Sequence, residues 1–60
     1  MSKTARFYSL IADCGWMTHR ELATFTGWSR SSIDGCLMRL QRENAIRPVN
    51  VGGRRAYAVA

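Results

Sequence analysis

Two helix start signals on either side of one glycine constrain this chain more than any other feature. Thr18 and Glu21 have the spacing of a capping box, in which each side chain accepts a hydrogen bond from a free backbone N–H of the first turn. Met17 and Leu22, which flank this cap, have the spacing of a hydrophobic staple, and this is a second signal for the same helix start. We therefore predict a helix over residues 18–26 that ends at Gly27.

The second helix start follows this glycine almost at once. Ser29 is a preferred N-cap residue, and Trp28 and Ile33 have the spacing of another staple. Apolar residues then recur at helical spacing, namely Ile33, Cys36, Leu37 and Leu40. We predict a helix over residues 29–43, and Asn44 suits the left-handed conformation that often ends a helix.

An earlier amphipathic segment predicts another helix, over residues 3–13, with Ser2 as its N-cap and Gly15 as its C-cap. Its apolar face consists of Phe7, Leu10, Ile11 and Cys14. Trp16 and Met17 then form a short link, for which a single strand is an alternative.

From Ile46 the hydrophobic period changes to two, which is the period of a strand. The two glycines at 52–53 are a hairpin turn signal. This turn sets a register in which Pro48 lies opposite Tyr57 at a non-hydrogen-bonded position, where a proline removes no hydrogen bond to the partner strand. The face that we expect to pack on the helices consists of Ile46, Pro48, Tyr57 and Val59.

Together these patterns predict one α+β domain over residues 1–60, mainly helical with a small β-hairpin. A chain of this size buries only about 60% of the surface that its unfolded form exposes, so we expect modest stability. Hydrophobic residues make up 47% of the chain, enough for one compact core. No apolar run approaches the roughly 20 residues of a membrane span, and the N-terminus lacks the pattern of a signal peptide. We expect a cytoplasmic protein outside the membrane.

Few residues are suited to metal or catalytic chemistry. Cys14 and Cys36 fall at core-facing helical positions, and His19 is the only histidine, whereas a zinc site needs about four ligands. We expect two buried free thiols, with a disulfide or a redox switch as alternatives, and an exposed His19. A catalytic triad and a phosphate-binding glycine loop are both missing, so neither an enzyme nor a cofactor is expected.

The formal net charge of +5 is unevenly distributed. Residues 1–28 carry a net charge of +1, and residues 29–60 carry +4, from six arginines against Asp34 and Glu43. Arginine makes bidentate contacts with phosphates and guanine edges better than lysine does. A polyanionic partner is therefore favoured over solubilising surface charge, which would mix lysine and acidic residues more evenly.

Two helices joined by a short glycine-containing turn are a helix-turn-helix arrangement. The residues that match a known pattern are Glu21-Leu22-Ala23, Thr26-Gly27, Ser29-Arg30-Ser31-Ser32-Ile33, Leu37 to Leu40, Asn44-Ala45-Ile46-Arg47, and Gly52-Gly53-Arg54-Arg55 followed by Tyr57. In this order and spacing they resemble the winged-helix family of bacterial and phage regulators. The resemblance implies a three-helix bundle with a C-terminal wing at about residues 46–59. It also implies a small transcription regulator that binds double-stranded DNA sequence-selectively, with helix 29–43 in the major groove and the basic wing on the flanking backbone or minor groove.

The face of helix 29–43 opposite its apolar stripe supplies the candidate DNA contacts. A helix fits the major groove with its N-terminal residues nearest the base edges. Arg30 lies in the first turn, where the helix dipole disfavours a cation unless a phosphate shares the site. The candidate residues on this face and its flanks are Arg30, Ser31, Ser32, Gly35, Met38, Arg39 and Arg42.

Gly35 stands where family members often present a longer base-reading side chain, and a mid-helix glycine costs about 1 kcal/mol relative to alanine. Close approach of DNA or of another backbone explains it, or the cost is simply tolerated. Base reading is therefore expected to rest on Ser31, Ser32, Met38 and Arg39, with the other arginines on phosphates. Asp34 would repel phosphate. Arg54 and Arg55 at the hairpin tip suit a minor groove or a flanking phosphate, the alternative being two solvated arginines.

Other functions and partners stay open at this point. A winged-helix protein-interaction module, for instance on RNA polymerase, is the main alternative, although it would not need six arginines along the helix and wing. Binding of double-stranded RNA or left-handed DNA is a third, although the asparagine, tyrosine and tryptophan expected for left-handed DNA readers are missing. We expect Phe25 to pack against the first helix. Alternatively it forms a homodimer patch with Tyr8, and dimers could also assemble on DNA.

Overall fold

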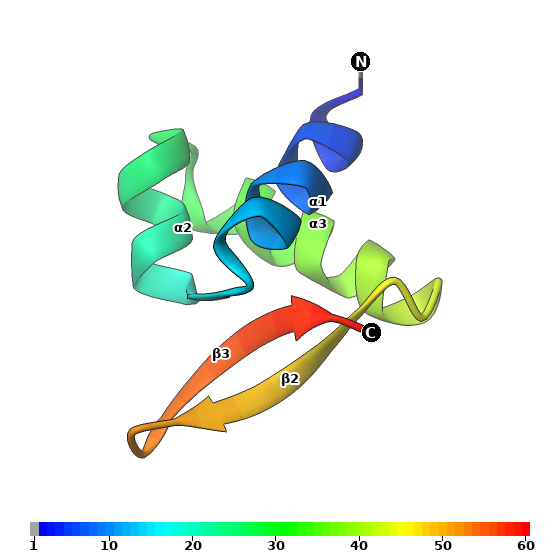
Figure 1. The fold of residues 1–60 in the computed structure, drawn as a ribbon. Coiled ribbons are helices and arrows are strands. Elements are labelled where there is room, and N and C mark those ends of the chain that lie inside the picture. Colours follow the sequence, from blue (N-terminus) through cyan, green and yellow to red (C-terminus); the bar gives the residue numbers. More distant parts are fainter. Residues whose placement is uncertain (1) are drawn as a thin grey trace.

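The structure of this chain is a computed structural model that describes residues 2–60. These residues form three helices and a three-stranded antiparallel sheet, which is a small α+β fold. In chain order the elements are α1 (Lys3–Cys14), β1 (Trp16–Thr18), α2 (His19–Thr26), α3 (Arg30–Arg42), β2 (Ile46–Val51) and β3 (Arg54–Val59). Figure 1 shows the tip of the β2–β3 hairpin projecting away from the helices. The α+β class that the sequence predicts is confirmed.

The predicted starts of α2 and α3 are confirmed by their hydrogen bonds. Thr18 N–H donates to Glu21 Oε1 at 3.0 Å, and Glu21 N–H donates to Thr18 Oγ1 at 3.1 Å, which completes the capping box of α2. Ser29 caps α3 by accepting a hydrogen bond from the N–H of Ser32. Because these caps satisfy donors that the helices cannot satisfy themselves, local sequence determines where α2 and α3 begin.

The chain leaves α3 through a Schellman motif. Asn44 has the predicted left-handed conformation, with a φ of 58°. The N–H of Asn44 donates to the carbonyl of Gln41 at 3.0 Å, and the N–H of Ala45 donates to the carbonyl of Leu40 at 2.9 Å. The helix ends one residue before its predicted end, because Glu43 is already the C-cap. This reversal directs the chain from α3 into β2.

The sheet has the strand order β1-β3-β2, with β3 in the middle and both pairings antiparallel. Gly52 and Gly53 form the predicted hairpin turn, both with positive φ, and Pro48 lies opposite Tyr57 as predicted. The link at Trp16–Thr18 is the strand β1, which pairs with β3 on the side away from β2. Three residues are too few for a periodic signal, so the sequence could not decide between link and strand.

One hydrophobic core joins the helices to the sheet. Every element contributes buried hydrophobic residues, and they are Phe7, Ile11, Met17, Leu22, Ile33, Cys36, Leu37, Leu40, Ile46 and Ala56. Tyr57 and Val59 of β3 are half-buried against this core. Pro48 is exposed, so the prediction that it packs on the helices is wrong. It lies on the edge strand β2, farther toward the hairpin tip than the buried Ile46.

The two free cysteines differ in burial. Cys36 is buried in the core as predicted. Cys14 is exposed, so the prediction of a second buried thiol is wrong. It is the last residue of α1, which ends one residue later than predicted, and the last buried residue of that helix is Ile11. The last turn of α1 therefore extends beyond the core, and Cys14 lies in this turn.

An aromatic stack holds the turn between α2 and α3 against α1. The ring centroids of Phe7 and Trp28 lie 5.8 Å apart, with an angle of 16° between the ring planes. Lys3 Nζ lies 4.6 Å from the centroid of the Trp28 ring, within the range of a cation–π interaction. Because Trp28 directly precedes the cap of α3, this contact fixes the start of α3 relative to α1.

We expect Thr18→Ala to lower the free energy of unfolding by about 1 kcal/mol, because α2 loses its capping hydroxyl. In a domain of this size that loss lowers Tm by roughly 4–8 °C, which thermal unfolding followed by circular dichroism can measure. Thr24→Ala is the matched control. Thr24 is exposed within α2, where alanine has the higher helix propensity, so its Tm should not fall. An equal fall in both variants would contradict the role of the cap.

Candidate nucleic-acid interface

The side of α3 opposite the core is open to solvent. Because its core side carries Ile33, Cys36, Leu37 and Leu40, helical geometry turns the opposite side of the helix outward. Of the predicted α3 contact residues, Ser32 is half-buried and the rest are exposed, namely Arg30, Ser31, Gly35, Met38, Arg39 and Arg42. We call this surface the α3 face. Ser31, Gly35, Met38 and Arg42 run along its centre, with Arg30 and Arg39 on opposite flanks.

Ser32 takes part in the cap of α3 as well as in the α3 face. Its N–H donates to Ser29 Oγ at 3.3 Å, and the Ser29 hydroxyl donates to Ser32 Oγ at 3.2 Å. Ser32 Oγ therefore keeps its own proton for a further acceptor. The N-terminal end of the α3 face thus presents two hydroxyls, of which that of Ser31 is the more exposed.

Two arginines of α3 are paired with carboxylates one turn later in the same helix. Arg30 Nε lies 3.9 Å from Asp34 Oδ2, and Arg39 Nε lies 3.3 Å from Glu43 Oε2. All four side chains are more than half exposed, and exposed pairs of this spacing contribute only about 0.3–0.5 kcal/mol. An anion that approaches the α3 face can therefore compete for both guanidinium groups. Within residues 2–60, Arg42 has no ion-pair partner.

A contact between α2 and α3 was not predicted from the sequence. His19 Nε2 lies 2.9 Å from Asp34 Oδ1, and the histidine side chain is only 34% exposed. His19 is half-buried and not exposed as predicted, because the packing of α2 on α3 brings its ring to the Asp34 carboxylate. Asp34 is held between His19 and Arg30, which draws its carboxylate toward these two partners.

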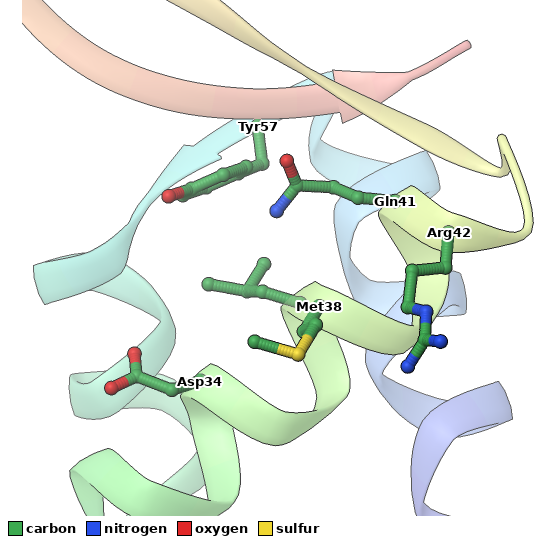
Figure 2. A pocket seen from close by; sticks show the side chains of 6 residues that line it. Asp34, Met38, Gln41, Arg42 and Tyr57 are labelled. Carbon is green, nitrogen blue, oxygen red and sulfur yellow. The ribbon is translucent and has the colours of Figure 1, made fainter.

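A groove of about 460 Å³ separates α3 from the sheet, and its lining residues are Asp34, Leu37, Met38, Gln41, Arg42 and Tyr57. Figure 2 shows the Gln41 amide and the Tyr57 ring on the sheet side of this groove, and Met38 and the Arg42 guanidinium farther from the sheet. Sequence reasoning assigned Tyr57 to the core and did not consider Gln41. The helical position of Gln41, beside the apolar stripe on the flank that carries Asp34, is a signal that could have indicated it.

Arg54 and Arg55 lie apart from the α3 face. Both are exposed and directly follow the turn of the hairpin, whose tip projects from the helices in Figure 1. As neighbours in a strand they point to opposite faces of the sheet, and Arg55 shares the face of Tyr57. A partner that contacts both α3 and these arginines must extend along the hairpin.

The two aromatic residues proposed for a homodimer border different hollows. Phe25 is 66% exposed and does not pack on the core, so the prediction that it packs against the first helix is wrong. Phe25 lines a hollow together with Leu10 and with the stacked rings of Phe7 and Trp28. Tyr8 borders a separate hollow between α1 and the C-terminal half of α3. The structure does not bring Phe25 and Tyr8 into one patch.

A scan against models of protein families finds no match for this chain, and searches of curated proteins and of solved structures find none either. Any function must therefore be argued from the residues and their geometry. Among residues 2–60, no three His, Cys, Asp or Glu side chains lie close enough together to hold a metal ion. No helix in this part of the chain is long and apolar enough to cross a membrane.

Gly27, at the end of α2, and Gly35, within α3, test where the folded chain requires a glycine. A Cβ added at Gly35 or at Gly27 would meet no atom within 4 Å, but only Gly27 has a positive φ, of 69°. We expect Gly35→Ala to raise the free energy of unfolding by about 0.5–1 kcal/mol. Gly27→Ala should lower it by about 1–2 kcal/mol, because alanine resists the left-handed conformation.

Urea unfolding of both variants measures these changes. A loss of stability in Gly35→Ala would contradict the conclusion that nothing in the folded chain requires a glycine at this position.

Proposed function

We propose that this chain is a winged helix-turn-helix domain that binds double-stranded DNA sequence-selectively, as a small transcription regulator does. In this proposal α3 enters the major groove and the β2–β3 hairpin is a wing on the flanking backbone or minor groove. The observation that carries the proposal is the α3 face. It is a solvent-exposed helical surface with two hydroxyls at its N-terminal end, a glycine at its centre and arginines along its length.

The charge distribution supports a polyanionic partner. Six of the eight arginines lie in residues 29–60, and within the described chain only Arg30 and Arg39 pair with a carboxylate, each weakly. A DNA phosphate near the start of α3 would be favoured by the free N–H groups, the helix dipole and Arg30 together. The same phosphate would relieve the unfavourable position of Arg30 in the first helical turn.

The shape of the α3 face supports insertion into a groove. The residues nearest the base edges in a docked helix are those of its N-terminal half, which here are Ser31, Ser32 and Gly35. Small side chains at these positions let the helix approach the bases closely. Base reading then rests on the serines, Met38 and Arg39, whereas Arg42, Arg54 and Arg55 contact phosphates or the minor groove.

A protein-interaction module is the second candidate, and the exposure of Phe25 is the observation that favours it. An aromatic ring at the rim of a hollow is a common anchor for a protein partner. Phe25 lies on α2, outside the α3 face, so a protein contact there would not exclude DNA binding through α3. Retention of DNA binding by Phe25→Ala would separate the two functions.

Titration of a labelled duplex at two salt concentrations tests the proposed function. We expect affinity to fall steeply as salt rises, because each neutralised phosphate releases condensed counterions. Absent or salt-independent binding would favour the protein-interaction module.

Arg39→Ala should change the preference among duplexes in a random-library selection, since Arg39 flanks the base-reading part of α3.

We expect the double variant Arg54→Ala with Arg55→Ala to weaken binding to all duplexes alike. The slope of log K against log salt should become shallower by about 2, or roughly 0.9 for each phosphate that the variant no longer neutralises. Arg6→Ala is the control, because it removes an exposed cation on α1, beside Phe25 and outside the α3 face. If the slope of the double variant equals that of the wild type, the hairpin is not in contact with DNA.

A further inference from the structure

Met38 is an exception among the side chains of the α3 face. It is 60% exposed, and the other large exposed hydrophobic residues of the described chain, Trp16 and Phe25, lie on β1 and α2. Hollows border Met38 on both sides. One is the groove toward Tyr57, and the other, of about 440 Å³, is lined by Gly35, Arg39, Arg42 and Glu43 as well as Met38. Met38 is therefore an apolar ridge between two depressions.

The surroundings of this ridge indicate the chemistry of its occupant. Gly35, one turn earlier, leaves empty space where a Cβ would lie. Arg42, one turn later, has no ion-pair partner in the described chain, and the pair of Arg39 with Glu43 is exposed and weak. The complementary surface must therefore present an apolar group within a field of negative charge. Duplex DNA has this combination, with phosphates on both sides of the base edges.

The major groove offers one apolar group, the C5-methyl of thymine. The other base features exposed there are hydrogen-bond donors and acceptors, together with the small C5–H of cytosine, which lacks the volume of a methyl group. The thioether of Met38 is at most a weak acceptor and donates nothing. It therefore cannot replace the hydrogen bonds to water that a polar base edge loses on binding. A polar base edge left unpaired beneath Met38 would weaken binding. The thymine methyl is therefore the major-groove feature with which this side chain can form the largest apolar contact.

We infer that Met38 is a specificity-determining residue that contacts the C5-methyl of a thymine in the major groove, with Gly35 admitting α3 close enough for that contact. This inference rests on the proposed DNA-binding function and deepens it, since it names the base feature that α3 prefers. The unbranched side chain of Met38 can adjust to the methyl group without a fixed backbone position.

The test uses duplexes chosen by wild-type protein from a random library. Each thymine of a bound duplex is replaced in turn by uracil, which differs only in lacking the methyl group. We expect one replacement to weaken binding about fourfold, the effect of one buried methyl-sized group. Met38→Ala should bind the thymine and uracil duplexes equally, and Met38→Leu should retain the discrimination. Arg42→Ala, on the same face, should bind both duplexes more weakly but keep the fourfold ratio.

Each other outcome overturns the inference. Selected duplexes without a recurrent thymine, or tight binding that no uracil replacement weakens, would exclude a methyl contact and leave the proposed function intact. An equal uracil effect in wild type and Met38→Ala would assign the methyl contact to another side chain or to DNA shape. Failure of wild-type protein to bind any duplex would overturn the proposed function, and this inference with it.

Discussion

Burial of Ile33, Leu37 and Leu40 ties α3 to α1, to α2 and to the first residue of β2. Because successive helical residues differ by about 100° in direction, this burial also decides which side chains point to solvent. Ser31, Gly35, Met38 and Arg42 are outward for the same reason that the apolar stripe is inward. The α3 face is thus a consequence of the core, and it needs no separate stabilising contacts.

The two ends of α3 limit its rotation and its sliding along the core. At its start, the Ser29 cap lies next to Trp28, whose ring stacks on Phe7 of α1, and His19 of α2 contacts Asp34. At its end, the Schellman motif at Asn44 sends the chain directly into the buried Ile46. A surface that reads bases needs its side chains held in position within fractions of an ångström. A helix that is fixed at both ends can hold them in this way.

The features of the fold that could be predicted from sequence arise within a few neighbouring residues. A capping box, a left-handed asparagine and a pair of turn glycines act through hydrogen bonds and φ angles that a short segment determines alone. The pairing of β1 with β3 and the contact of His19 with Asp34 join distant segments, and no periodicity in either segment reveals the other. Phe25 was misplaced for a related reason. Its spacing is compatible with packing on α1, but a hollow lies between these elements, and the Phe7 ring stacks on Trp28 instead.

Gly35 is where local preference and the observed structure disagree most. The helix around it has good caps and a regular apolar stripe, and alanine would fit without a clash, so the glycine weakens α3 with no gain inside the folded chain. Natural sequences break such local rules mostly at functional positions, where the compensating contact lies with a partner. In the proposed complex, the contacts with DNA offset this cost. A helix without a side chain at position 35 can lie deeper in the major groove, where the short hydroxyls of Ser31 and Ser32 reach the bases.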